Sequence, residues 1–391
     1  MTQASPHPGL LPTGLADLLP PMAAAAAAAA ARVLGALGAH GYDQATPPML
    51  EFEDSFLVEA AAPLQRETFR MMDPASQRML ALRSDLTPQI ARIAATRLAK
   101  APRPLRLCYL GTVLRVSGER AGGDRQFTQA GAELIGARQA EADAEIVLLA
   151  ARALAAVGVP DVVVDLNAPR MASDVAVAMG LAAEDAPAMR DALDRKDAAE
   201  ARRLAPPGAG DVLTGLIDAG GEAETAFAAV AKLDLPAAAV QRIARLKNIV
   251  ALIRAEAPNL PLTIDFVEYR GFDYHTGVAF SLFAKGHKGE IGRGGRYRAP
   301  PPDGGDPAGE PAVGFSLFME AACAAATPTA TPLKLYLPYG AGGDARLAAM
   351  AAGHVVVAGL APETDILAEA RRLGCDGAWR DGAAIILEKD A

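Results

Sequence analysis

Cysteine is scarce in this sequence: Cys108, Cys323 and Cys375 are the only three in 391 residues. They are far apart and odd in number, and no CxxC or Cys/His cluster accompanies them. This excludes a disulfide framework and a zinc site of ordinary spacing. Each cysteine is best interpreted as a small buried apolar residue in a reducing compartment. We expect no metal, and no residue pattern asks for a cofactor.

Positive charge is also in short supply. The chain has 38 lysines and arginines against 46 aspartates and glutamates, a net charge of −8, and a pI near 5.3. An acidic chain is a poor electrostatic partner for a polyphosphate backbone. We therefore expect no nucleic-acid partner, although a local basic patch stays possible.

Long apolar runs and a secretory leader are missing as well. The N-terminus, MTQASPHPGLLPTG, has no basic segment followed by an apolar core. The longest apolar run is Met22–Ala31, which ends at Arg32 and is well short of the roughly 20 residues that span a bilayer. We expect a cytoplasmic protein that has no membrane partner.

The composition itself favours a large folded core. Hydrophobic residues make up 51% of the chain and charged residues 21%, which excludes wholesale disorder. At about 150 residues per domain, the length predicts two or three domains. Residues 22–37 are predicted to form a packed helix. Residues 41–51 contain two prolines, so this extended segment belongs at a sheet edge or an interface.

The remaining pattern predicts three domains of an α+β protein. Residues 1–167 plus 256–328 are rich in strands, residues 168–255 form a helical insertion, and residues 329–391 form a small α/β module. The predicted helices and strands that frame the motifs are strands at 79–82, 105–116, 126–135, 162–166, 262–267, 274–283 and near 291, helices at 85–100 and 141–157, and a strand leading into a helix at 311–325. In the tail, strands are expected at 333–337, 355–357 and 383–387, with Gly374 ending a helix. A proline- and glycine-rich loop is expected at 299–310.

Six segments, in order, resemble those of one enzyme family. They are residues 41–51 (motif 1), 82–87 (LRSDLT), 114–133 (motif 2, ending RQFTQAGAE), 269–277 (YRGFDYHTG), 294–297 (GGRY) and 311–315 (the start of motif 3). This series resembles the class II aminoacyl-tRNA synthetases in the version of histidyl-tRNA synthetase. The resemblance implies a six- or seven-stranded antiparallel sheet flanked by helices, which dimerises through motif 1.

The resemblance also implies a pocket for L-histidine. Carried over by position, its members are Asp85, Thr87, Arg115, Gln129, Glu133, Arg270, Tyr274 and His275. Their chemistry suits a free amino acid, because acids meet its ammonium group and guanidinium forks meet its carboxylate. A spacing of four places Gln129 and Glu133 on the same side of a strand.

Other roles stay open for several of these residues. Asp85 and Thr87 could instead cap a helix, and Gln129 and Glu133 could lie on a solvated face. Arg270 could bridge strand ends. His275 stands where the family has a second tyrosine, so it either contacts the ligand or fills the core. Residues 294–297 could form only a tight turn, and Arg120 and Arg125 either lie in a solvated loop or hold phosphate.

The groups that adenylation needs are missing. The family has Arg-x-Glu in motif 2, whereas Ser117 follows Arg115-Val116 here, and the ATP-gripping arginine of motif 3 is replaced by Ala321. Losing one such transition-state contact typically costs about 10²–10³ in rate. The tail after Pro332 is also shorter than the family's anticodon-binding domain.

A scaffold that keeps the amino-acid pocket and loses catalysis resembles one paralogue family, the regulatory subunits of ATP phosphoribosyltransferase. That resemblance implies a non-enzymatic partner of the short-form catalytic subunit, a suspected hetero-octamer, and feedback inhibition by L-histidine in the first step of histidine biosynthesis. The alternatives are an active histidyl-tRNA synthetase-like adenylating enzyme and an assembly scaffold with a vestigial pocket.

Overall fold

The structure is a computed structural model, and it describes residues 9–56, 66–118, 124–269, 274–302, 305–328 and 331–388. The chain divides into two compact units, residues 1–327 and residues 328–391. Each unit has a sheet and a hydrophobic core of its own.

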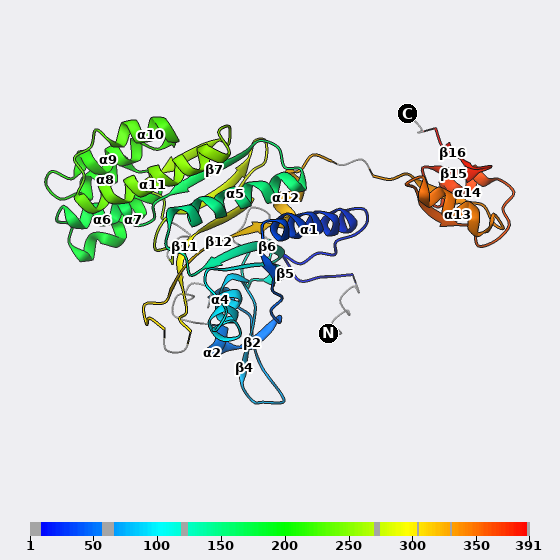
Figure 1. Ribbon diagram of the computed structural model, residues 1–391, viewed down its shortest axis with the longest axis horizontal. Coiled ribbons are helices and arrows are strands. Elements are labelled where there is room, and N and C mark those ends of the chain that lie inside the picture. Colours follow the sequence, from blue (N-terminus) through cyan, green and yellow to red (C-terminus); the bar gives the residue numbers. More distant parts are fainter. Residues whose placement is uncertain are drawn as a thin grey trace, which may run out of the picture. The chain divides into compact units, whose positions relative to one another are not determined.

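A nine-stranded sheet forms the centre of the first unit, in the order β1-β5-β6-β12-β11-β10-β7-β9-β8 (Figure 1). Its strands are β1 (Asp43–Gln44), β5 (Leu105–Leu114), β6 (Gln126–Ile135), β7 (Val162–Asn167), β8 (Gly221–Glu222), β9 (Leu262–Asp265), β10 (Ala279–Ala284), β11 (Gly292–Ala299) and β12 (Glu310–Phe318). The six strands from β5 to β7 pair antiparallel, whereas β1 on β5 and β9 on β7 are parallel. The predicted α+β fold is confirmed, and the sheet is mixed only toward its edges.

Helices cover both faces of this sheet. One face carries α1 (Met22–Ala39), α5 (Ala140–Val157) and α12 (Met319–Ala325), and the other packs against α4 (Thr87–Thr96) (Figure 1). Because side chains alternate along a strand, the even positions of β6 meet α5 while its odd positions face the α4 side. The predicted site therefore lies on the α4 face.

The alanine-rich helix α1 is packed rather than free. Ala29, Val33 and Leu37 recur every four residues and are buried in the same core as α5, as the predicted apolar stripe requires. Among the described helices, α1 is the one long and apolar enough to cross a bilayer by length and composition. Its buried side is confined to these three positions, and most of the other residues of α1 are exposed.

The proline-bearing segment lies at edges, as predicted. β1 is the outermost strand of the large sheet, and β2 (Leu50–Phe52) is an outer strand of a three-stranded sheet with the order β2-β4-β3. The other members there are β3 (Arg70–Met72) and β4 (Met79–Leu82), and α2 (Glu53–Phe56) follows β2. β3 was not predicted.

Residues 168–255 are almost wholly helical. Their elements are α6 (Met171–Ala178), η2 (Ala183–Asp185), α7 (Ala186–Asp194), α8 (Ala198–Leu204), α9 (Gly210–Asp218), α10 (Ala223–Val230) and α11 (Ala237–Glu256), together with the short strand β8. They gather at the β7 end of the sheet (Figure 1, green). That these helices form a domain of their own stays a prediction.

Some local predictions were wrong. The helix expected at 85–100 spans Thr87–Thr96, and Ser84 does not cap it because its hydroxyl pairs with that of Thr68. For residues 294–297 the alternative of a tight turn is wrong, since they lie inside β11. Regular pairing of β10 begins only at Ala279.

The second unit is a small α/β module, as predicted. Its elements are β13 (Lys334–Leu337), α13 (Gly342–Ala351), β14 (Val355–Ala358), α14 (Ile366–Arg372), β15 (Gly377–Arg380) and β16 (Ala383–Ile386). The order is β14-β13-β15-β16, parallel except for the last pair. Gly374 follows α14 with a φ of +63°, the left-handed conformation that ends a helix. β15 was not predicted.

Candidate functional site

The polar residues Gln129 and Glu133 lie on the α4 face of β6. Both side chains are buried, with 1% of each residue exposed. Their positions are fixed by backbone pairing along the whole of β6, which pairs with β5 on one side and with β12 on the other. The solvated-face alternative is therefore wrong for both residues. Burial of two such polar groups requires hydrogen-bond partners.

Glu133 finds those partners on the adjacent strand β5 and on β11, which lies two strands away. The Tyr297 hydroxyl donates to its Oε2 at 2.9 Å, and the Tyr109 hydroxyl lies 3.4 Å from its Oε1. Tyr109 also lies 2.8 Å from the hydroxyl of Ser316. A Cβ added at Gly314 would lie 1.8 Å from Glu133 Oε2. Glycine on β12 thus makes room for the carboxyl.

Burial changes the acidity of Glu133. Desolvation raises the pKa of this carboxyl to about 8, and hydrogen bonds from Tyr297, Thr87 and Tyr109 only partly oppose that rise. The nearby negative charge of Asp85 raises it further. At neutral pH the group holds a proton, and a cation placed beside it would favour the carboxylate.

Gln129, on the same strand as Glu133, is hydrogen-bonded to the residues that precede α4. Its Oε1 accepts from the backbone N–H of Leu86 at 3.0 Å, and its Nε2 donates to Asp85 Oδ2 at 3.1 Å. Asp85 Oδ1 accepts from the backbone N–H of Thr87 at 2.9 Å. Asp85 therefore has two roles: one carboxylate oxygen binds a backbone N–H at the start of α4, and the other faces Gln129 in the site.

Arg115 completes the polar cluster at the end of β5. Its Nη2 lies 3.6 Å from Asp85 Oδ2, its Nε donates to the carbonyl of Ser84 at 3.2 Å, and its guanidinium lies 5.2 Å from the Phe127 ring centroid. We call the set Asp85, Thr87, Tyr109, Arg115, Gln129, Glu133, Tyr274 and Tyr297 the Glu133 cluster. It holds acids, a guanidinium and neutral hydrogen-bonding groups on one face of the sheet.

The segment after residue 273 supplies two stacked rings. Tyr274 is 40% exposed, and its ring centroid lies 6.4 Å from that of Tyr297. His275 is 2% exposed and stacks on Tyr274 at 4.1 Å. A Cβ at Gly295 would lie 2.3 Å from His275 Cδ2, so this ring lies directly on the β11 backbone. His275 is buried in the protein interior behind Tyr274.

Six of the eight predicted pocket residues meet in the Glu133 cluster: Asp85, Thr87, Arg115, Gln129, Glu133 and Tyr274. His275 is adjacent, and Arg270 lies outside the described residues. The sequence reasoning missed Tyr109 and Tyr297 as members of the site. Tyr109 lies at an odd position of β5 and packs in the cluster on the α4 face, so the alternation along β5 was the available signal.

The two positions that differ from the synthetase pattern have other uses here. Ser117 donates its hydroxyl to the carboxylate of Glu67 at 2.7 Å. Ala321 packs on the hydrophobic cores of both faces of the sheet. Its neighbour Glu320 accepts the backbone N–H of Thr128 at 2.9 Å. Within the described residues, no group of three or more metal-ligating side chains gathers.

Comparison with known proteins agrees with this fold. The family model for histidyl-tRNA synthetase matches residues 14–322. A solved ATP phosphoribosyltransferase regulatory subunit/histidyl-tRNA synthetase from Bacillus halodurans aligns with a TM-score of 0.79 at 22% identity, covering 94% of this chain and 97% of that one. A chain of the ATP phosphoribosyl transferase (HisG:HisZ) complex from Thermotoga maritima aligns with a TM-score of 0.58 at 15% identity, covering 74% of this chain and 96% of that one. The fold is thus that of the histidyl-tRNA synthetase-like proteins.

Relatives at higher identity narrow the assignment. The ATP phosphoribosyltransferase regulatory subunit of Rhodospirillum centenum is 48% identical over 378 residues, which is 97% of this chain and 96% of that protein. The protein of the same name from Paramagnetospirillum magneticum is 46% identical over 377 residues, 96% of this chain and 97% of its own length. The chain belongs to the family of ATP phosphoribosyltransferase regulatory subunits.

Proposed function

We propose that this chain is a non-catalytic subunit that binds L-histidine at the Glu133 cluster and transmits inhibition to a short-form ATP phosphoribosyltransferase catalytic subunit. It acts in the cytoplasm, without nucleic acid, at the first step of histidine biosynthesis. One observation carries the proposal: the amino-acid-binding groups of the synthetase-like site stand together while two positions for handling ATP hold Ser117 and Ala321.

The Glu133 cluster suits a free amino acid. Glu133 and Asp85 offer oxygens to an ammonium group, and Arg115 offers a guanidinium fork to a carboxylate. Gln129 and Thr87 add neutral hydrogen bonds, which favour a ligand with a polar ring. Arg270, predicted for the same site, would add a second guanidinium. A ligand that binds one assembly state more tightly than another shifts their populations, typically by about 1–3 kcal/mol.

We infer that the chain does not adenylate an amino acid from the two residues that replace the family's ATP-handling groups, Ser117 and Ala321. Ala321 contributes apolar packing to both hydrophobic clusters and offers no charge or hydrogen-bond donor to a phosphate. Ser117 is already bound to Glu67. These contacts favour a regulatory subunit over an active synthetase.

We infer a homodimer through the motif 1 region, within a hetero-octamer of four subunits of each kind. Large apolar side chains are exposed on the three-stranded sheet and just before β2; they are Met49, Leu50, Met71, Met72 and Met79. Exposed large apolar side chains gathered in one region are typical of a contact site. Leu50→Glu combined with Met72→Lys should therefore reduce the mass measured by light scattering to that of a monomer.

The central experiment mixes the protein with a short-form catalytic subunit and measures phosphoribosyl-ATP formation with and without L-histidine. We expect stimulation by this chain and inhibition by histidine. Glu133→Gln should keep the stimulation and lose the histidine response. Glu310→Gln, which removes a half-buried ion-paired carboxylate on β12 away from the cluster, is the matched control and should behave like the unaltered protein.

Three results would contradict the proposal. Absence of both stimulation and co-elution removes the regulatory role. Robust histidine-dependent ATP–pyrophosphate exchange restores the synthetase alternative. Stimulation without any calorimetric histidine binding leaves an assembly scaffold whose amino-acid site is vestigial.

A further inference from the structure

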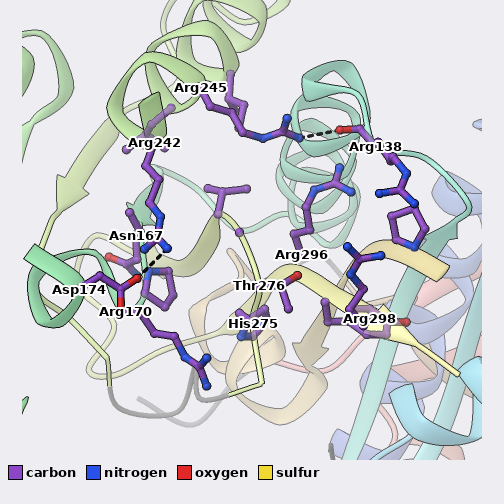
Figure 2. Close-up of a pocket in the computed structure, with 18 residues that line it drawn as sticks. Arg138, Asn167, Arg170, Asp174, Arg242, Arg245, His275, Thr276, Arg296 and Arg298 are labelled. Atoms are coloured by element: carbon purple, nitrogen blue, oxygen red, sulfur yellow. Dashed lines mark hydrogen bonds and ion pairs between the residues drawn. The ribbon is translucent and has the colours of Figure 1, made fainter. Parts of the chain in front are cut away.

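A second site candidate lies between α11 and the sheet, within the first unit. It is a cavity of about 490 Å³ whose lining includes six arginines and a single carboxylate, that of Asp174. The arginines are Arg138, Arg170, Arg242, Arg245, Arg296 and Arg298 (Figure 2). We call this cavity the arginine pocket. It concentrates positive charge in a chain whose net charge is −8.

The arginine pocket is distinct from the Glu133 cluster. Along β11, Tyr297 reaches Glu133 on one face, whereas Arg296 reaches Asp143 of α5 on the other. The two sites share one wall, because Tyr297 of the cluster lines the pocket too, as does His275, which stacks on Tyr274. The histidine-binding proposal therefore does not account for the pocket's charge.

Two of the arginines are held in place by a buried acid. Asp143 is fully buried and accepts from Arg296 Nε at 2.8 Å and from Arg245 Nη2 at 2.6 Å. Arg296 also donates to the carbonyls of Ala137 and Gln139. Arg245 donates in addition to the carbonyl of Arg138 at 2.9 Å, as Figure 2 shows. This network fixes the wall and orients Arg245 before any ligand arrives.

Other arginines keep donors for a ligand. Arg242 pairs with Asp174 through Nη2 at 2.6 Å (Figure 2). Arg298 uses Nη1 on the carbonyl of Gly309 at 3.0 Å. The guanidinium of Arg138 has no partner among the described residues. A guanidinium carries five N–H donors, so each of these groups has donors left for an anion.

An independent observation comes from Asn167, at the end of β7. This residue lines the pocket and is fully buried, yet both polar atoms of its amide lack a hydrogen-bond partner among the described residues. A buried amide without partners is costly. A ligand with donor and acceptor groups, or water accompanying it, would satisfy both atoms.

The size and chemistry define the ligand class. Guanidinium forks match phosphate oxygens and bind them in pairs. A volume of about 490 Å³ exceeds the space of a single phosphate and lies within the range of small-molecule sites. Leu246, Ile249 and Val278 give the pocket an apolar part beside the charged one.

We propose that the arginine pocket binds a small metabolite carrying two or more phosphate groups. The shared chemistry is a pyrophosphate moiety, which could belong to a nucleotide or to free pyrophosphate. Calorimetry on the full chain with inorganic pyrophosphate and, separately, with ATP distinguishes these sources. We expect saturable binding of at least one probe, which Arg242→Gln or Arg138→Gln weakens by about tenfold or more.

The chain offers a closely matched control. Arg152–Glu256 is an ion pair with the same 2.6 Å distance as Arg242–Asp174, and both arginine side chains are 44% exposed. Arg152→Gln removes the same charge outside the pocket and should change affinity by less than about twofold. Arg125→Gln tests whether the probe binds instead in the synthetase-like site, where Arg125 could hold phosphate. This variant should also leave binding of the probe intact. Asn167→Leu should weaken binding while the melting temperature stays the same or rises.

Each outcome decides the proposal. No saturable binding of either probe at millimolar concentration overturns it, and so does equal loss in Arg152→Gln and Arg242→Gln, which indicates nonspecific charge attraction. Loss in Arg125→Gln alone places the probe in the synthetase-like site and also overturns it. Histidine titration of Arg242→Gln separates the two proposals, because failure of the pocket leaves histidine binding unchanged.

Discussion

The Tyr297 hydroxyl donates a 2.9 Å hydrogen bond to Oε2 of Glu133, although the two residues are 164 positions apart. They sit on β11 and β6, and β12 runs between these strands. The bond crosses β12 at Gly314, where a side chain would collide with the carboxyl. A buried acid is thus held by a tyrosine two strands away, across a position where only hydrogen fits.

The first prediction concerns pH and stability. The pKa of Glu133 is about 8 in the folded protein against 4.5 for the ordinary side chain. Between these values the folded state binds a proton that the unfolded state has lost, so the free energy of unfolding falls as pH rises. The contribution is on the order of 1.4 kcal/mol per pH unit at most. Glu133→Gln should therefore gain stability over the unaltered protein progressively from pH 5 to pH 8, measured by urea denaturation.

Glu310→Gln serves as the comparison for that series, since Glu310 pairs with Arg103 at 2.9 Å. It should show no stability gain that increases with pH. A constant difference between Glu133→Gln and the unaltered protein across this range would show that the acid does not titrate as described.

The second prediction concerns proton release on histidine binding. At pH 7 the Glu133 carboxyl of the ligand-free protein is mostly protonated, and an ammonium group beside it favours the charged form. Binding should release protons and tighten as pH rises from 7 toward 8, by up to about tenfold per unit. Calorimetry in two buffers with different ionisation enthalpies counts the protons. Equal heats in both buffers would place the ligand's ammonium group away from Glu133.

The third prediction concerns Gly314. A methyl group there would lie 1.8 Å from Glu133 Oε2 and 2.7 Å from the carbonyl of Ala132. Gly314→Ala should destabilise the protein by about 1–3 kcal/mol and abolish histidine binding. Gly35→Ala is the control, because nothing lies within 4 Å of the added atom in α1. It should be neutral or stabilise by about 0.5–1 kcal/mol, and thermal unfolding compares the two.

The fourth prediction concerns the buried ion pair of Asp143 and Arg296, which are 0% and 8% exposed. Asp143→Ala leaves a buried guanidinium without its carboxylate and should cost about 3–5 kcal/mol. Replacing both residues, as Asp143→Leu with Arg296→Met, should recover most of that loss. If the double variant is as unstable as the single one, an unpaired charge is not the cause. Chemical denaturation measures both.

Much of the site was predictable from the family resemblance of the motifs, with strand parity in support. Gln129 and Glu133 share a face because they are four residues apart on a strand, and Asp85 and Thr87 stand together at the start of α4. Tyr109 was not predicted, since its role depends on Phe315 and Ser316, more than 200 residues away. The pairing of Ser117 with Glu67 was also beyond a local pattern.

From the sequence alone, the order of motifs and the alternation of apolar residues determined the class of fold and the order of most elements. The resemblance carried by those motifs also gave six of the residues that meet in the Glu133 cluster. Tertiary structure decided the rest. The raised pKa of Glu133 comes from burial beneath strands distant in sequence, and the arginine pocket joins residues from 138 to 311 that share no local pattern. Periodicity shows which way a side chain points, whereas desolvation and charge clustering depend on what the rest of the chain places beside it.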